Sequence, residues 1–375
     1  MILSTSFGAG HVRAAEALKE ACRGLDPDGR VEIVDFLRTF NRYLSRVAEE
    51  AYYAMTKHTP RMYKFFYEVE SKSAARLVRV ETRLGRGMLL RILEEIQPDC
   101  VISTHFLPAG VLDRLGERVK VPQGVVLTDY ESHPLWLYPG VDAYFVAHSG
   151  MRKELVAAGV QPERIHVTGI PIKAEFGAVR DREEVWRRLL TRHDLPLVLV
   201  ASGGRGIGPL LEVLEALDQV EVPVQAAVVA GRNPVMVRRL RDFARGLRVP
   251  TQVLGFVENL HEWMSIAELM IGKAGGLSVS EAIAAHLPMV IVRPTPGQEE
   301  GNTNYLTWHG AAVHVPDLAD LGAALNLLLS TPERLADMRR AAARIARPTA
   351  AREVVQTMLR LVRRRIPPGE ESSAL

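Results

Sequence analysis

The chain has 375 residues, of which 47% are hydrophobic and 24% charged, and its formal net charge is +3. This length suits two domains of about 170 residues each, and the composition is ordinary for a globular protein. The small net charge excludes polyanion binding by the chain as a whole, and we expect no nucleic-acid partner. Two cysteines, Cys22 and Cys100, cannot form a disulfide framework. The sequence also shows no basic leader and no apolar stretch of the roughly 18 residues needed to span a bilayer. Together with the low cysteine content, these features indicate a cytoplasmic protein.

Apolar runs that favour β-strands alternate with longer helical patterns in the first half of the chain. The expected strands are residues 2–4, 31–35, 100–104, 124–127, 143–146 and 165–168, with helices between them such as 11–24 and 84–96. The first strand is very short, so a complete start and a start that lacks a few residues both stay open.

The same alternation continues in the second half of the chain. The expected strands are residues 197–201, 224–229, 251–254, 269–271, 289–292 and 312–315, and the expected helices are 209–218, 234–245, 278–286, 318–329 and 333–345. Strands joined by crossover helices imply parallel sheets with helices on both faces. We therefore expect an α/β protein with two doubly wound domains facing a cleft. The expected parts are an N-terminal domain at 1–170, a C-terminal domain at 171–348, a basic helix at 349–366 that crosses back to the first domain, and a disordered tail at 367–375.

The most informative segment runs from Gly272 to Glu281. An apolar strand leads into three glycines and then into a helical pattern that starts at Ser278. Glycines let the backbone approach a ligand closely, and a helix N-terminus attracts an anion. A polar, acidic loop at residues 294–302 follows the next strand. A glycine-rich turn alone is weak evidence, but a diphosphate site beside an acidic loop suits a nucleotide-sugar.

A second glycine-rich loop, residues 202–208, follows the strand at 197–201. Its amide groups and Arg205 could help to hold a diphosphate, and the structural alternative is a strand-to-helix turn with surplus glycine. It is not a Walker loop, because no Gly-Lys-Ser/Thr ends it. The backbone edge at 254–259 could bind a flat base, although apolar packing explains that segment equally well.

His11 follows Gly8-Ala9-Gly10 after the first strand and opens a helix. A dinucleotide fingerprint would need a third glycine where Arg13 stands, and a turn with a capping polar residue is the structural alternative. A helix N-terminus disfavours the imidazolium ion. His11 is therefore predicted to be a neutral base that faces the cleft and accepts a proton.

The segment after the fourth strand is densely polar and contains Asp129, Glu131, His133 and Trp136. We interpret it as a second cleft wall, in which Asp129 orients the imidazole or an acceptor hydroxyl while His133 and Trp136 line the acceptor site. A solvated loop is the structural alternative. A metal site on Asp129, Glu131 and His133 is less favoured, because no further ligand set at metal spacing supports it.

Residues 36–92 interrupt the alternation of strands and helices. They contain twelve Lys or Arg against five acidic residues, with interleaved aromatics. A basic, aromatic, helical insertion suits an anionic membrane surface. A solvated helical pair with its aromatics in the core is the alternative. Nucleic-acid binding fits the charge, but no recognised module is present.

Seven segments together resemble one group of glycosyltransferases. They are SFGAGHVRAAEAL, TDYESHPLW, YFVAHSGMRKEL, VTGIPI, ASGGRGIG, GKAGGLSVSEAIAAHLPMV and PTPGQEEGNTNYL, and they extend from Ser6 to Leu306. The group contains the monogalactosyldiacylglycerol synthases and the bacterial processive diacylglycerol glucosyltransferases, and the lipid-linked peptidoglycan N-acetylglucosaminyltransferase is similar at a greater distance. The resemblance implies a GT-B fold, a UDP-sugar in the C-terminal domain, and no metal or other cofactor.

The resemblance also implies roles for individual residues. Residues 202–205 and 275–276 would contact the diphosphate, Phe256 and Val257 would hold uracil, and Glu281 would bind the ribose hydroxyls. The sugar or the phosphates would be held by Gln298, Glu299, Glu300 and Asn302. The expected donor residues are Ser202, Gly203, Gly204, Arg205, Phe256, Val257, Lys273, Gly275, Gly276, Leu277, Ser278, Glu281, Gln298, Glu299, Glu300 and Asn302. His11 and Asp129 are the expected catalytic residues, and Gly10, His133 and Trp136 the expected acceptor-side residues.

These residues and the resemblance predict an inverting transfer of glucose or galactose from a UDP-sugar to diacylglycerol or a glycosyl-diacylglycerol. The enzyme is expected to bind an anionic membrane surface as a peripheral protein on the inner face of the cell membrane. A UDP-sugar 2-epimerase, a glycosyltransferase for another lipid-linked acceptor and a non-enzymatic nucleotide-sugar sensor are the alternatives. An epimerase would need further acidic groups deep in the cleft and no lipid surface.

Overall fold

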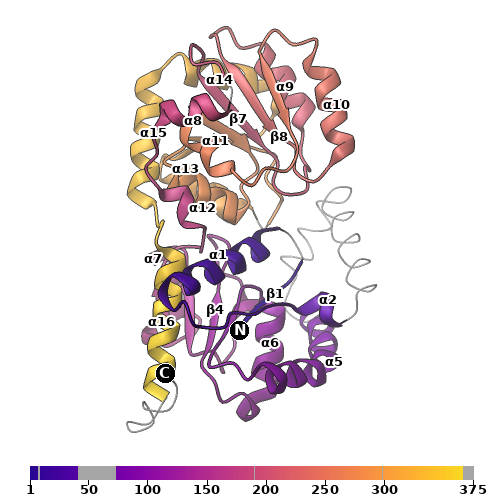
Figure 1. The fold of residues 1–375 in the computed structure, drawn as a ribbon, viewed down its shortest axis with the longest axis vertical. Helices are drawn as coiled ribbons and strands as arrows, with labels where there is room; N and C mark the ends of the chain where they lie inside the picture. The colour runs from indigo at the N-terminus through magenta and orange to yellow at the C-terminus, as the bar shows by residue number, and fades with distance from the viewer. Residues whose placement is uncertain (7–8, 41–72, 190, 298, 366–375) are drawn as a thin grey trace. The chain divides into compact units, whose positions relative to one another are not determined.

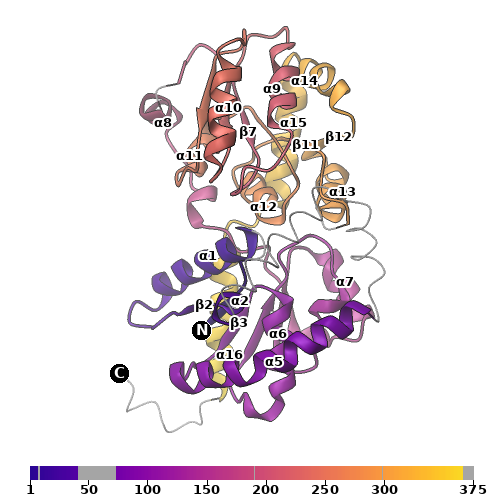
Figure 2. The same cartoon turned by 90° about the vertical axis from the view of Figure 1, so that its right-hand side faces the viewer.

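The computed structural model describes residues 1–6, 9–40, 73–189, 191–297 and 299–365. The chain divides into two compact units: unit 1 contains Met1–Lys173 and Thr349–Leu375, and unit 2 contains Ala174–Pro348. Each unit is a parallel six-stranded sheet with helices packed against it (Figures 1 and 2).

The sheet of unit 1 has the strand order β2-β1-β3-β4-β5-β6. Its strands are β1 (Ile2–Ser4), β2 (Ile33–Asp35), β3 (Val101–Ser103), β4 (Gln123–Val126), β5 (Ala143–Val146) and β6 (Ile165–Val167). β1, β3, β4 and β5 are buried along their whole length, as expected for parallel strands covered on both faces.

Helices cover both faces of this sheet (Figure 2). They are α1 (Ala9–Leu25), α2 (Phe36–Phe40), α5 (Ser73–Ile96), α6 (Phe106–Leu115), α7 (Ser149–Ala157) and α16 (Ala350–Arg365), with short 3-10 helices η1 (Gly116–Arg118), η2 (Pro134–Trp136) and η3 (Pro162–Arg164). α1 packs beside α16, where the small side chains of the buried Ala15 and Ala17 let the two helices approach closely. An ion pair of 2.6 Å between Arg365 and Asp142 ties the last turn of α16 to the start of β5.

The sheet of unit 2 has the strand order β12-β11-β10-β7-β8-β9. Its strands are β7 (Leu197–Ala201), β8 (Gln225–Val229), β9 (Thr251–Leu254), β10 (Leu269–Gly272), β11 (Met289–Val292) and β12 (Ala312–Val315). Its helices are η4 (Ala174–Gly177), α8 (Arg182–Leu189), α9 (Leu210–Asp218), α10 (Pro234–Ala244), α11 (Leu260–Ile266), α12 (Gly276–Ala284), α13 (Glu300–Trp308), η5 (Leu318–Asp320), α14 (Leu321–Leu329) and α15 (Pro332–Ile345). Aliphatic side chains of β7, β8 and β10 pack with those of α9, α10 and α14 in one large core cluster.

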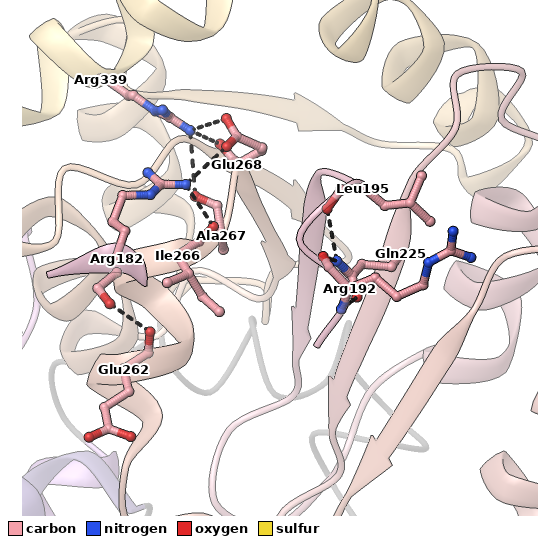
Figure 3. A network of polar contacts seen from close by, with 10 residues as sticks. Arg182, Arg192, Leu195, Gln225, Glu262, Ile266, Ala267, Glu268 and Arg339 are labelled. Atoms are coloured by element: carbon pink, nitrogen blue, oxygen red, sulfur yellow. Dashed lines mark hydrogen bonds and ion pairs between the residues drawn. The ribbon is translucent and has the colours of Figure 1, made fainter. Parts of the chain in front are cut away.

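Glu268, the residue just before β10, joins two helices of unit 2 (Figure 3). Its carboxylate accepts from Arg182 of α8 at 3.2 Å and from Arg339 of α15 at 2.6 Å. Arg182 also donates to the carbonyl oxygen of Ile266 at 3.0 Å. The pairs are partly exposed, so their contribution is mainly to fix the start of β10 rather than to add much stability.

The predicted α/β fold with two Rossmann-like domains is confirmed, and all twelve predicted strands are present. Some predicted bounds differ from the structure. The helix expected at 84–96 starts at Ser73, the helix expected from Ser278 starts at Gly276, and the loop expected at 294–302 gives way to α13 at Glu300. Residues 41–72, the centre of the predicted membrane-binding insertion, lie outside the described residues. In the described part of the chain, no helix combines the length and apolar character needed to cross a bilayer.

Candidate functional site

In unit 1, His11 follows β1 and the buried pair Thr104 and His105 follows β3. In the sheet, β2 lies on one side of β1 and β3 on the other, so the strand order reverses between β1 and β3. Crevices at such points, at the carboxyl ends of the strands, are the usual ligand sites of open α/β sheets.

The His11 ring is held through its Nδ1 atom. This atom lies 2.8 Å from the carbonyl oxygen of Thr104 and 3.0 Å from the hydroxyl oxygen of Thr128. A carbonyl oxygen can only accept, so Nδ1 carries the proton in the neutral ring and Nε2 keeps its lone pair. Burial lowers the pKa of His11 from 6.5 to about 4, and its bond to Thr104 opposes this shift. The arrangement is that of a neutral imidazole able to accept a proton at Nε2.

Two other rings contact His11. His105 meets it edge to face, with ring centres 4.7 Å apart, and Trp136 lies 6.3 Å away. His105 stacks on Phe106 at 4.2 Å, and its Nδ1 atom accepts from the amide of Leu107 as the N-cap of α6. Burial lowers the pKa of His105 well below 6.5, and the neighbouring His11 adds to the effect. The sequence prediction missed His105 and Thr104, although both stand at the carboxyl end of a predicted strand.

The structure brings Trp136 into ring contact with His11, with ring centres 6.3 Å apart. His133 caps η2, and its Nδ1 atom accepts from the amide of Leu135 at 3.3 Å. Asp129 is half-buried and directly follows Thr128. The orienting role predicted for Asp129 stays a prediction, while the contacts to His11 Nδ1 come from Thr104 and Thr128. Gly10 lies in the first turn of α1, one residue before His11.

In unit 2, the strand order reverses between β7 and β10, and two predicted donor segments meet there. A small pocket is lined by Ser202 and Gly208 of the glycine-rich loop and by Gly272 and Lys273 of the β10 end. Gly272 pairs with Ala201, and a Cβ atom at Gly272 would lie 2.5 Å from the Ala201 carbonyl oxygen. Glycine at this position therefore lets the two strands keep their spacing.

The glycine-rich loop is a folded turn rather than a loose connection. Gly203 and Gly206 have φ angles of 72° and 64°. A Cβ atom at Gly206 would also lie 1.9 Å from the carbonyl oxygen of Ala230, so only glycine fits. The amide of Arg232 donates to the Gly204 carbonyl at 2.9 Å. Arg205 is exposed beside these residues.

The N-terminus of α12 follows the end of β10, which lines the pocket together with this loop. Gly275 is its N-cap, and the first intrahelical bond runs from the Val279 amide to the Gly275 carbonyl at 2.9 Å. The amides of Gly276, Leu277 and Ser278 precede that bond and have no partner within the helix. Such amides and the helix dipole form an anion-binding site.

The segment after β11 packs against the same turn. The buried side chain of Asn302 donates to the Ala274 carbonyl at 2.8 Å. Glu299 Oε2 accepts from the amide of Thr295 at 2.5 Å, and Glu299 Oε1 lies 3.6 Å from where a Cβ atom of Gly275 would be. Glu300 is half-buried at the start of α13, and the predicted donor residue Gln298 lies outside the described residues.

Three further predicted donor residues lie on α12 and after β9. Glu281 is 2% exposed on α12. Phe256, after β9, is 45% exposed, and the guanidinium carbon of Arg232 lies 4.0 Å from its ring centre. Val257 follows it, half-buried. The sequence prediction missed Arg232. The pattern that could have identified it is a glycine followed by a charged residue just after β8.

Among the described residues, no group of three or more His, Cys, Asp or Glu side chains is arranged to hold a metal ion. The two units thus differ in chemistry. Unit 1 presents a half-buried neutral imidazole, and unit 2 presents main-chain donors.

Comparison with known proteins adds two family matches. Residues 11–172 match the model of the monogalactosyldiacylglycerol (MGDG) synthase family, and residues 200–345 match that of the glycosyl transferases group 1. The processive diacylglycerol beta-glucosyltransferase of Bacillus mycoides (strain KBAB4) is 30% identical over 368 residues, which cover 96% of this chain and 92% of that protein.

Solved structures with the same fold include MurG of Acinetobacter baumannii, with a TM-score of 0.63 and 17% identity over 96% of this chain and 98% of that chain. The UDP-GlcNAc 2-epimerase of Neisseria meningitidis bound to UDP-GlcNAc has a TM-score of 0.61 and 14% identity over 96% and 98% of the two chains. At these identities the structural matches establish the fold and nothing more.

Proposed function

The chain belongs to the family of the processive diacylglycerol beta-glucosyltransferases, and from this premise we propose that it transfers a hexose from a UDP-sugar to diacylglycerol or to a glycosyl-diacylglycerol. The observation that carries the proposal is 30% identity over 96% of the chain to a protein of that activity. The chain is a hexosyltransferase with a GT-B fold. Glucose and galactose differ at one hydroxyl group, and both remain candidate donors.

Unit 2 holds the donor in this proposal. As the bond between the sugar and UDP breaks, negative charge grows on the β-phosphate. The amides of Gly276, Leu277 and Ser278 and the dipole of α12 stabilise that charge, and Ser202 and Lys273 line the pocket at the ends of β7 and β10. Main-chain donors then take the place of a metal ion, so we propose that transfer needs no metal and no other cofactor.

Unit 1 supplies the base. His11 Nε2 takes the proton of the acceptor hydroxyl while that oxygen attacks the anomeric carbon on the face opposite to UDP. The new carbon–oxygen bond forms as the bond to the diphosphate breaks, and the proton ends on His11. A single displacement converts an α-linked donor into a β-linked product. Positioned general bases contribute roughly 10²–10⁴ to such rates.

The lipid acceptor places the reaction at a membrane. We propose that the basic region of residues 36–92 holds the enzyme on the anionic inner face of the cell membrane. Helix α5 supports this, because Arg76, Arg79, Arg83 and Arg86 are spaced by three or four residues and their positions fall along one side of the helix.

A UDP-sugar 2-epimerase shares the fold but is less supported. The 2-epimerase match has only 14% identity, which speaks for the fold alone, whereas the glucosyltransferase match extends over almost the whole chain at 30%.

Incubation of the purified chain with radiolabelled UDP-glucose or UDP-galactose, diacylglycerol and phosphatidylglycerol vesicles tests the proposal. A β-linked glycolipid is the expected product, identified by mass and linkage analysis. An epimerised nucleotide-sugar without glycolipid would indicate the epimerase, and binding of UDP-sugar without any product would indicate a sensor. Either result would overturn the proposed activity.

A further inference from the structure

Two uncharged oxygen atoms bracket Nδ1 of His11. The Thr104 carbonyl lies 2.8 Å from it and the Thr128 hydroxyl 3.0 Å. Thr104 is fully buried and Thr128 is 4% exposed, so little water competes for these contacts. The two threonines follow β3 and β4, which are neighbours in the sheet.

The two threonines act on His11 in different ways. Thr104 also donates its hydroxyl to the main-chain carbonyl of His11 at 3.1 Å, and its amide bonds to Leu3 at 2.9 Å. Thr104 therefore belongs to the framework that holds the start of α1. The Thr128 hydroxyl instead reaches the His11 ring itself. Removing that hydroxyl tests the ring contact without removing a bond to the helix backbone.

We infer that Thr128 is a positioning residue for sugar transfer: its hydroxyl, with the Thr104 carbonyl, accepts the Nδ1 proton of His11, selects the tautomer with a free Nε2 lone pair, and stabilises the imidazolium formed when the acceptor proton moves. The inference rests on the proposed function, in which His11 is the base. In the step, the acceptor O–H bond breaks, an Nε2–H bond forms, and the ring becomes positive. Its Nδ1–H bonds strengthen at that moment, because hydrogen bonds from a charged donor are stronger than those from a neutral one.

Neutral acceptors explain how His11 stays unprotonated before the reaction. A carboxylate at this position would raise the pKa of the ring, whereas burial holds the pKa of His11 near 4 and the carbonyl opposes this only in part. Among the described residues, His105 is the titratable group in ring contact with His11, while Asp129 directly follows Thr128 and Arg13 stands two residues after His11 on α1. The Nδ1 atom of His105 accepts from a main-chain amide, as in a neutral ring.

The test compares Thr128→Val, which keeps the shape and removes the hydroxyl, with Thr128→Ser, which keeps the hydroxyl. Hydrogen bonds to charged groups contribute about 1.5–3 kcal/mol, so we expect Thr128→Val to lower kcat about 10- to 100-fold. The KM for the UDP-sugar should stay within about twofold, because the contact strengthens only when the ring is charged. Thr128→Ser should restore kcat to within about threefold of the wild type by the same contact.

Nitrogen-15 NMR of the histidine rings gives a readout that does not depend on activity. In the wild type, His11 should show a protonated Nδ1 and an unprotonated Nε2, and Thr128→Val should shift the Nδ1 signal or mix the tautomers. The exposed ring of His193 serves as an internal reference. Wild-type kcat together with an unchanged His11 spectrum in a folded Thr128→Val variant would overturn the inference. If Thr128→Val misfolds, the kcat of Thr128→Ser and the tautomer of His11 in the wild type still test the inference. A wild-type His11 ring with its proton on Nε2 would overturn the inference by itself.

Failure of the inference and failure of the proposed function are distinguishable. If His11→Ala keeps full turnover, His11 is not the base and the proposed mechanism falls, whatever the NMR spectra show. If His11→Ala abolishes turnover while Thr128→Val behaves as the wild type, only the role of Thr128 is wrong.

Discussion

The hydroxyl oxygen of Thr128 lies 3.0 Å from Nδ1 of His11, although 117 residues separate the two in the chain. The contact forms because β1, β3 and β4 are consecutive in the sheet, so the residues that follow their carboxyl ends meet at one edge. Thr104, after the middle strand, completes the arrangement. A parallel sheet can thereby fix the tautomer of a histidine with neutral groups alone.

Replacement of His11 by alanine should remove the base and leave donor binding intact, because the donor residues proposed here belong to unit 2. We expect kcat to fall by roughly 10²–10⁴ and the Kd for UDP to stay within about twofold. Turnover assays and calorimetry with UDP measure the two quantities. His193→Ala, at an exposed histidine, is the control, and unchanged turnover in His11→Ala would defeat the assignment.

Acidification should destabilise the protein through His11 and His105. The pKa of His11 falls from 6.5 to about 4 on folding and that of His105 well below 6.5, so the unfolded chain binds more protons between pH 4 and 6.5. The contribution of the two neutral rings to the free energy of unfolding is therefore fully present above about pH 6.5. It decreases as the pH falls towards 4, by at most about 1.4 kcal/mol per pH unit for each ring.

His105→Asn keeps an N-cap acceptor for α6 and removes one of the two titrating rings. In urea unfolding at pH 7 and pH 5, the variant should lose less stability between the two values than the wild type does. His193→Asn is the exposed control and should behave as the wild type. An equal loss in His105→Asn and the wild type would show that His105 does not contribute.

Gly272→Ala should disturb the donor pocket. The new Cβ atom would lie 2.5 Å from the carbonyl oxygen of Ala201, so β10 and β7 must move apart at their carboxyl ends. We expect a destabilisation of about 1–3 kcal/mol and weaker UDP binding. Gly246→Ala is the control, because its nearest atom is 3.7 Å away. If both variants unfold at the same urea concentration, the spacing of the strands does not depend on Gly272.

Arg232 and Phe256 should act together on the uracil end of the donor. Their stack at 4.0 Å fixes an exposed ring beside the glycine-rich loop. Phe256→Ala should weaken UDP binding about 5- to 100-fold and leave pyrophosphate binding within about twofold, since stacking on a base contributes about 1–3 kcal/mol. Arg232→Met should weaken UDP binding less, because a cation–π contact contributes about 0.5–2 kcal/mol.

The exposed Arg239→Met variant on α10 is the control for the loss of an arginine. Calorimetry with the two ligands separates base recognition from phosphate recognition. Equal losses for UDP and pyrophosphate in Phe256→Ala would contradict a role at the base.

Reversing the four α5 arginines at positions 76, 79, 83 and 86 to glutamate should weaken sedimentation with phosphatidylglycerol vesicles by at least roughly tenfold, since each basic residue near the surface contributes about 1 kcal/mol. The matched control reverses Arg238, Arg239, Arg241 and Arg245, which are exposed on or next to α10. Unaffected binding in the α5 variant, or an equal loss in the control, would show that α5 does not face the membrane.

The fold could be predicted almost completely because its signals are local. Each buried strand is a short apolar run between turn residues, and each glycine-rich turn follows such a run, so periodicity is enough to find them. The errors occur where backbone geometry outweighs residue propensity. Gly276 and Glu300 both begin helices, although glycine and a run of polar residues favour a loop.

The candidate site could be predicted only where its residues are chemically conspicuous. His11 stands out because it is a histidine just after a predicted strand, and the turn before α12 stands out because its glycines follow another. Thr104 and Thr128 do not, because a threonine at a strand end is ordinary and its contact to His11 depends on the order of strands in the sheet. Arg232 reaches Phe256 from a different strand for the same reason. Strand order arises from long-range packing, which a local pattern does not contain.

A crystal of the protein soaked with UDP tests the central claim most directly. The account predicts diphosphate oxygens at about 2.7–3.2 Å from the amides of Gly276, Leu277 or Ser278, with the uracil ring beside Phe256. A nucleotide bound elsewhere, or a diphosphate turned away from the first turn of α12, would contradict it.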